Sequence, residues 1–164
     1  LFVCLGNICR SPMAEGVFRR VIEQEGVAHL FEIDSAGLGD WHVGQAPDAR
    51  AQAAARRRGM DISGQSARQI PSADFTRFDL LLAMDGSNVE ELVQLAPETE
   101  RHKIRRFLDF APHLGTRDVP DPFFGGRAGF DHALDLIEEA ARGLLAELTA
   151  ETPAAGKKVH ASRG

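Results

Sequence analysis

A cysteine and an arginine, Cys4 and Arg10, stand near the start of the chain with five residues between them. A cysteine thiolate is a strong nucleophile, and a guanidinium group can hold two oxygens of a phosphate at once. The pair therefore predicts a nucleophile placed against a bound phosphate group. Because this spacing by itself arises often by chance, the prediction depends on the residues around the pair.

The residues around the pair predict an anion-binding loop between a strand and a helix. Residues 1–3 are apolar and predict the strand, and Gly6 and Asn7 tolerate the positive φ that a tight loop needs. Ser11 is expected to cap the helix and Pro12 to occupy its first turn. A loop that ends on a helix N-terminus directs backbone N–H groups toward an anion. The same surroundings favour the thiolate form of a cysteine, and the serine hydroxyl can bond to its sulfur.

The stretch 3–15 resembles, nearly residue for residue, the signature of the low-molecular-weight protein tyrosine phosphatases. The resemblance extends over about residues 1–148, and further motifs follow in the order of the family. These motifs are Ser35-Ala36-Gly37, Trp41 with Gly44, Pro47-Asp48, Ala67-Arg68-Gln69, Met84-Asp85 with Ser87-Asn88, and Asp121-Pro122-Phe123-Phe124-Gly125.

The resemblance implies a two-step mechanism without a metal or another cofactor. Cys4 attacks the phosphorus atom and becomes phosphorylated, while Asp121 protonates the leaving oxygen and then activates water. Arg10 and the backbone N–H groups of residues 5–10 hold the equatorial oxygens. The expected catalytic residues are Cys4, Arg10 and Asp121. The expected phosphate-binding residues are Leu5, Gly6, Asn7, Ile8, Cys9, Arg10 and Ser11.

Four side chains are expected to form the substrate pocket: Ile8, Trp41, Phe123 and Phe124. Trp41 lies on a glycine-flanked loop, where it could cap the core or give a substrate ring a surface for stacking, and the resemblance favours stacking. The two phenylalanines occupy positions where many relatives carry tyrosines. Since the chain contains no tyrosine, control by phosphorylation of its own tyrosines is excluded. His42 is expected to be a surface histidine without a role.

Three further residues leave alternatives open. Cys9 could be a packing residue or could form a protective disulfide with an oxidised Cys4, as the resemblance suggests. Gln65 replaces a histidine that in the family is linked to the loop asparagine, and it could keep that brace. Asp85 could act near the site or only begin a helix.

Strands and amphipathic helices alternate along the chain and predict a single-domain α/β fold, an open parallel sheet with helices on both faces. The resemblance implies four strands, with the phosphate-binding loop after the first. The predicted domain spans residues 1–149, and residues 150–164 are predicted to be a disordered tail. The expected strands are residues 1–3, 31–35, 78–84 and 103–108, and the expected helices are residues 12–25, 48–58, a segment capped by Ser87 or Asn88, and a last one ending near residue 148.

Composition sets limits on partners and location. The net charge of −5 argues against nucleic-acid binding, and no apolar run reaches the length of a membrane span. Two cysteines make no disulfide framework, so we expect a cytoplasmic protein. The expected partner is a tyrosine-phosphorylated protein, and the expected assembly is a monomer or weak dimer.

The sequence favours a tyrosine phosphatase over three other functions. An arsenate reductase would need further cysteines, and none follows Cys9. A phosphoarginine phosphatase tends to carry threonine where this chain has Ile8, which favours an aryl phosphate. A phosphate-binding module without turnover would not need Cys4, Ser11 and Asp121 together.

Overall fold

A four-stranded parallel sheet forms the centre of the protein in the computed structural model, which describes residues 1–161. The strands are β1 (Phe2–Cys4), β2 (Ser35–Gly37), β3 (Leu81–Ala83) and β4 (Ile104–Arg106), in the order β2-β1-β3-β4. The predicted open parallel sheet is confirmed. Each strand has three residues: β3 and β4 lie inside their predicted runs, and β1 is shifted by one residue. The predicted strand 31–35 is wrong except at Ser35, because the ladder with β1 begins there and continues to Gly37.

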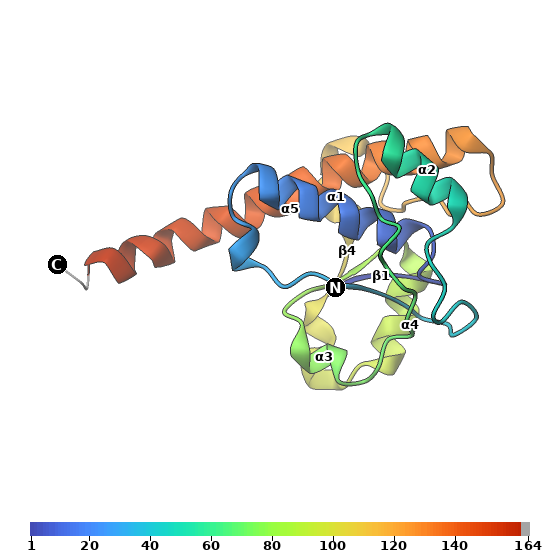
Figure 1. Cartoon of the computed structure of the whole chain (residues 1–164). Coiled ribbons are helices and arrows are strands. Elements are labelled where there is room, and N and C mark those ends of the chain that lie inside the picture. Colours follow the sequence, from blue (N-terminus) through green and yellow to red (C-terminus); the bar gives the residue numbers. More distant parts are fainter. Residues whose placement is uncertain (162–164) are drawn as a thin grey trace.

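Helices cover both faces of the sheet, as the alternation of elements predicts. On one face lie α1 (Arg10–Gln24), α2 (Ala49–Arg57) and α5 (Arg127–Ala161), and on the other lie α3 (Asp74–Arg77) and α4 (Gly86–Leu95) (Figure 1). The 3₁₀ helices of the described part are η1 (Ala28–Leu30), η2 (Glu98–Lys103), η3 (Phe107–Phe110) and η4 (Pro112–Leu114). None of the helices in residues 1–161 combines the length and the apolar composition needed to cross a membrane.

The alternation of side chains along β1 divides the core into two clusters. Phe2 and Cys4 belong to the cluster under α1, α2 and α5, whereas Val3 belongs to the cluster over α3 and α4. Phe2 is almost fully buried and makes edge-to-face contacts with Phe18 and Phe107, with ring centroids 5.9 and 5.2 Å apart. Burial of a side chain of this size contributes about 1.5–3 kcal/mol. The sheet therefore holds Cys4 at the carboxyl end of a fully packed strand.

The start of α1 differs from the prediction. The helix begins at Arg10 with Cys9 at the N-cap position, and no side chain caps it. Ser11 is thus inside the first turn rather than before it. Its hydroxyl bonds to the sulfur of Cys4 and to Asn7 instead of to the helix backbone.

The C-terminal segment also differs from the prediction. Helix α5 continues to Ala161, so residues 150–161 are helical where the sequence predicts a disordered tail. Pro153 and Gly156 in this stretch disfavour a helix, but extending a helix that is already formed needs no new nucleation step. The last three predicted tail residues, 162–164, lie outside the described residues. The domain boundary at residue 149 stays a prediction.

Candidate active site

The loop between β1 and α1 wraps around the sulfur of Cys4. Asn7 has φ 58°, the left-handed conformation that an asparagine tolerates better than most residues. This conformation lets the backbone N–H of Asn7 donate to Cys4 Sγ at 3.3 Å, and the Ser11 hydroxyl lies 3.0 Å from the same sulfur. The thiol is 3% exposed. Two hydrogen-bonding groups thus surround the sulfur.

The Asn7 side chain keeps the loop in this shape. Its amide nitrogen donates to the hydroxyls of Ser11 and Ser35 at 2.8 and 3.0 Å, and its Oδ1 accepts from the backbone N–H of Arg68 at 3.0 Å. Of the alternatives left open for Gln65, the structure does not show the brace to Asn7: Gln65 Nε2 instead donates to the Pro12 carbonyl in the first turn of α1, 3.0 Å away. The Arg68 main chain acts on Asn7 in its place.

Arg10 lies almost fully buried at the other end of the loop, held by two acceptors. Its Nη1 donates to Asp85 Oδ2 at 2.7 Å and to the Val119 carbonyl at 2.9 Å. Asp85 also caps α4 by accepting from the backbone N–H of Asn88 at 2.8 Å. The two roles considered for Asp85 therefore occur together, and the predicted caps of this helix, Ser87 or Asn88, are corrected to Asp85. Bound in this way, the guanidinium keeps one orientation.

Asp121 reaches the site from a long loop that precedes α5. Its Oδ2 lies 3.7 Å from Arg10 Nη2, and its side chain is 41% exposed. The first part of this loop is attached to the sheet, since Val119 N–H donates to the Met84 carbonyl at 2.8 Å. Asp118 Oδ1 accepts from the backbone N–H of Gly86, at the start of α4. The loop thus carries a carboxylate to the arginine of the first loop.

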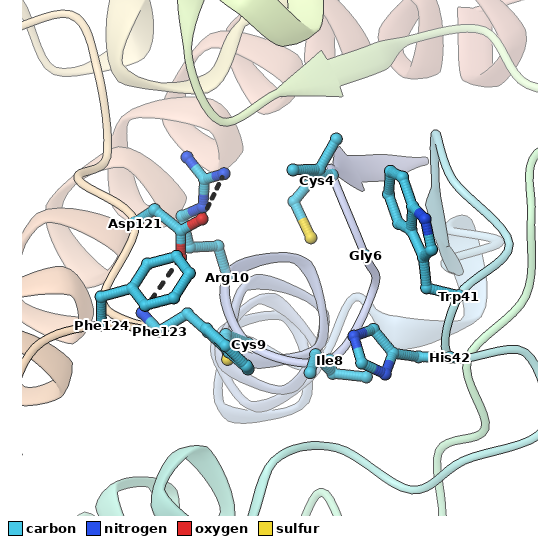
Figure 2. Close-up of a pocket in the computed structure, with 11 residues that line it drawn as sticks. Cys4, Gly6, Ile8, Cys9, Arg10, Trp41, His42, Asp121, Phe123 and Phe124 are labelled. Atoms are coloured by element: carbon cyan, nitrogen blue, oxygen red, sulfur yellow. Dashed lines mark hydrogen bonds and ion pairs between the residues drawn. The ribbon is translucent and has the colours of Figure 1, made fainter.

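A cavity of about 180 Å³ opens above the sulfur of Cys4. Figure 2 shows the sulfur pointing into it, with Trp41 on one side and Asp121, Phe123 and Phe124 on the other. Its lining residues are Cys4, Leu5, Gly6, Ile8, Cys9, Arg10, Trp41, His42, Asp121, Phe123 and Phe124. The structure thus brings together the three predicted catalytic residues and the four predicted pocket residues. Of the predicted phosphate-binding residues, Asn7 and Ser11 are buried and do not line the cavity.

The description "Low molecular weight phosphotyrosine protein phosphatase" belongs to the family model that matches residues 1–154. The chain belongs to this family. It is 45% identical over 152 residues to a putative low molecular weight protein-tyrosine-phosphatase of Synechocystis, covering 92% of this chain and 96% of that protein. A structure of the protein tyrosine phosphatase of Entamoeba histolytica superposes with a TM-score of 0.89 at 39% identity, over 92% of this chain and 96% of the other. Another structure, described as a Drosophila arginine phosphatase, superposes with a TM-score of 0.84 at 33% identity, over 90% of this chain and 95% of the other.

Sequence reasoning missed a contact of this phosphatase at His42. The ring lies beside Gly6 in the wall of the cavity, so near that a Cβ on this glycine would be 3.1 Å from His42 Cδ2 (Figure 2). His42 Nδ1 is 3.0 Å from Gln45 Oε1, which fixes the ring. The signal that could have found it is its position next to Trp41, on the loop already assigned to the pocket.

Cys9 differs from Cys4 in its surroundings. Burial raises its pKa well above the ordinary value, and the negative charge of Asp48 acts in the same direction. Cys9 is therefore a neutral thiol at physiological pH. Within residues 1–161 no cluster of three or more histidine, cysteine or acidic side chains is suited to hold a metal ion.

Proposed function

We propose that the protein hydrolyses phosphotyrosine in proteins through a cysteinyl-phosphate intermediate. The observation that carries this proposal is the placement of Cys4 Sγ at the floor of a cavity whose opposite walls carry Trp41 and Asp121. A flat aryl group can stack on the indole while its phosphate rests on the loop. The family membership supports the reaction class.

In the first proposed step, the Cys4 thiolate attacks phosphorus and the bond to the aryl oxygen breaks. Asp121 gives its proton to that oxygen, so the leaving group departs as a neutral phenol. In the second step the ionised Asp121 takes a proton from water, which attacks phosphorus and releases Cys4. Arg10 and the loop N–H groups stabilise the equatorial oxygens in both steps. The Ser11 hydroxyl can stabilise the thiolate as it leaves.

The alternative substrate is phosphoarginine. It is favoured by one comparison, the structural similarity to the Drosophila protein described as an arginine phosphatase. Against it stands Ile8 in the cavity wall, an apolar side chain that offers no hydrogen bond to a guanidinium group. The aromatic wall and Ile8 together favour phosphotyrosine.

For the setting, we propose a cytoplasmic enzyme that acts on tyrosine-phosphorylated proteins as a monomer or weak dimer. Both cysteines are free thiols, which suits a reducing compartment. Nucleic acids and membranes are not proposed as partners, in keeping with the net charge of −5.

We also propose that Cys9 protects the nucleophile against oxidation. A peroxide oxidises the Cys4 thiolate to a sulfenic acid, and the Cys9 sulfur then displaces water to form a disulfide. Because the pKa of Cys9 is raised, little of its attacking thiolate exists at neutral pH, and disulfide formation is expected to be slow. Activity recovered with dithiothreitol after peroxide treatment should fall in Cys9→Ser, and equal recovery in both proteins would exclude the protective role.

The main test is phosphate release from a phosphotyrosine peptide in EDTA, compared with a phosphoarginine peptide. Cys4→Ser is expected to abolish release, and Asp121→Asn to lower kcat/KM by about 10²–10⁴. Phosphate release from the phosphoarginine peptide alone would show that phosphoarginine, not phosphotyrosine, is the substrate. Phosphate release that persists in Cys4→Ser would refute the mechanism. As a control, thermal unfolding of Cys4→Ser and Asp121→Asn tests whether both variants are folded.

A further inference from the structure

Arg50, in the first turn of α2, lies against the loop that carries Asp121. Its guanidinium is fixed by Asp48, whose Oδ1 lies 3.0 Å from Arg50 Nε and whose Oδ2 lies 3.0 Å from Arg50 Nη2. Asp48 is itself the N-cap of α2, because its Oδ1 accepts from the backbone N–H of Arg50 at 2.8 Å. The guanidinium thus has a defined plane and position although nearly half of the side chain is exposed.

The Arg50 guanidinium also packs against two aromatic rings. Arg50 Cζ lies 5.4 Å from the centroid of Phe123, on the Asp121 loop, and 4.9 Å from that of Phe130, on α5. Its Nη1 also donates to the carbonyl of Gly125 at 3.3 Å. One side chain of α2 therefore contacts both the second half of the loop and the helix that follows it.

The second half of this loop has few polar attachments, although Pro122 is buried and Phe123 packs against the core. The first half is bound through Asp118 and Val119, as described above. In the described part of the chain, residues 120–125 make polar contacts with other elements through two arginines, Arg10 and Arg50. Arg10 must also bind the phosphate, so Arg50 provides the polar contact that stays in place during the reaction.

The position of Asp121 depends on this attached segment. The backbone N–H of Phe123 donates to Asp121 Oδ1 at 3.1 Å, so a shift of Phe123 turns the carboxylate. The ring of Phe123 also forms part of the cavity wall. A contact that fixes Phe123 therefore fixes both the acid and one wall of the pocket.

We propose that Arg50 is a positioning residue that holds the Asp121 loop over the cavity, so that the carboxylate faces the leaving oxygen. The proposal rests on the function proposed for Asp121 as the acid. Arginine suits the task because its planar group can stack on Phe123 and Phe130 while its edge bonds to Asp48 and Gly125. A lysine could supply the charge but not the plane.

The test measures kcat/KM in EDTA for aryl phosphates whose phenols differ in acidity. When the acid is well placed, the rate depends little on the pKa of the leaving phenol, and when it is displaced, poor leaving groups lose most. The slope of log kcat/KM against that pKa does not depend on the fraction of folded protein. It therefore separates a positioning role from a merely structural one.

For Arg50→Ala we expect a loss of about 10-fold with phenyl phosphate, a much smaller loss with 4-nitrophenyl phosphate, and thus a steeper slope than wild type. Arg50→Lys should give an intermediate slope, and Asp121→Asn the steepest. The matched control is Arg57→Ala, from the same helix, whose guanidinium pairs with Asp131 of α5 at 2.8 Å and does not touch the loop. Its slope should equal that of the wild type.

A wild-type slope in Arg50→Ala, or an equal loss on all substrates, would overturn the positioning role and leave the proposed function intact. A different result would overturn the function proposed for Asp121: if the wild-type slope is as steep as that of Asp121→Asn, Asp121 does not act as the acid, and Arg50 has no acid to position.

Discussion

Replacing Asp85 by asparagine tests whether the arginine of the phosphate loop is held by charge. The substitution keeps the shape of the side chain, and an asparagine Oδ1 can still accept from the backbone N–H of Asn88 and cap α4. What it removes is the negative charge 2.7 Å from Arg10 Nη1. The variant therefore isolates the ion pair from the helix cap.

The expected cost follows from the burial of the pair. The side chain of Arg10 is 4% exposed and that of Asp85 21%. Breaking a fully buried pair costs about 3–5 kcal/mol, whereas an exposed pair contributes at most about 1 kcal/mol. Between these limits, and with the Val119 carbonyl still accepting from Arg10, we expect Asp85→Asn to lower the free energy of unfolding by about 2–3 kcal/mol.

Urea unfolding with and without inorganic phosphate measures this cost. A phosphate on the loop would replace Asp85 as the counter-ion of Arg10, so phosphate should stabilise the variant more than the wild type. The control is Asp109→Asn, which removes an exposed pair with Arg117 and should cost at most about 1 kcal/mol. A cost for Asp85→Asn no larger than this, or equal stabilisation of both proteins by phosphate, would refute the reasoning.

Three further predictions concern the loop and its surroundings. Gly37→Ala should lower kcat/KM about 10-fold or more, because its Cβ would lie 3.0 Å from the Gly6 carbonyl carbon and displace the loop. Iodoacetamide at neutral pH should alkylate the nucleophile and leave Cys9 unmodified by mass spectrometry, since burial raises the pKa of Cys9. The hydrogen bond from Arg50 lowers the pKa of Asp48 below its ordinary value of 3.8. The Asp48 carboxylate therefore stabilises the fold fully above pH 3.8, and this stabilisation should be lost as the pH falls through the lowered pKa. Asp48→Asn should remove this part of the acid dependence of urea unfolding.

Each of these predictions has an outcome that contradicts it. For the glycine, the control is Gly64→Ala, whose Cβ would meet no atom within 4 Å, and equal activity of the two variants would exclude the steric argument. Alkylation of Cys9 at the rate of Cys4 would show that its thiol is not held neutral. An unchanged acid dependence in Asp48→Asn would show that its carboxylate titrates alike in the folded and unfolded chain.

The phosphate loop could be predicted from the sequence because its geometry is local. A strand, a glycine-asparagine turn and a helix start within a dozen residues suffice to place Cys4 and Arg10 on one anion. The residue types needed for such a turn are few, so the motif is specific. The alternation of strands and helices likewise sufficed for the parallel sheet.

The contacts that hold the parts together could not be predicted, because they join segments far apart in the chain. Arg10 and Asp85 are 75 positions apart, as are Arg50 and Gly125, and no local pattern marks either pair. The question left open at Gln65 could not be decided for another reason: the group that bonds to Asn7 is the backbone N–H of Arg68, which residues of almost any type can supply.

The place of β1 in the sheet determines when the enzyme can be assembled. Of the four strands β1 comes earliest in the chain, yet it is central, with Phe2 paired to Ser35 on one side and to Leu82 on the other. In a growing chain one edge of β1 therefore stays unpaired until β3 has left the ribosome, and unpaired apolar strand edges aggregate readily. The acceptor for Arg10 on Val119 arrives later still. The nucleophile is thus synthesised before the segments that complete its site.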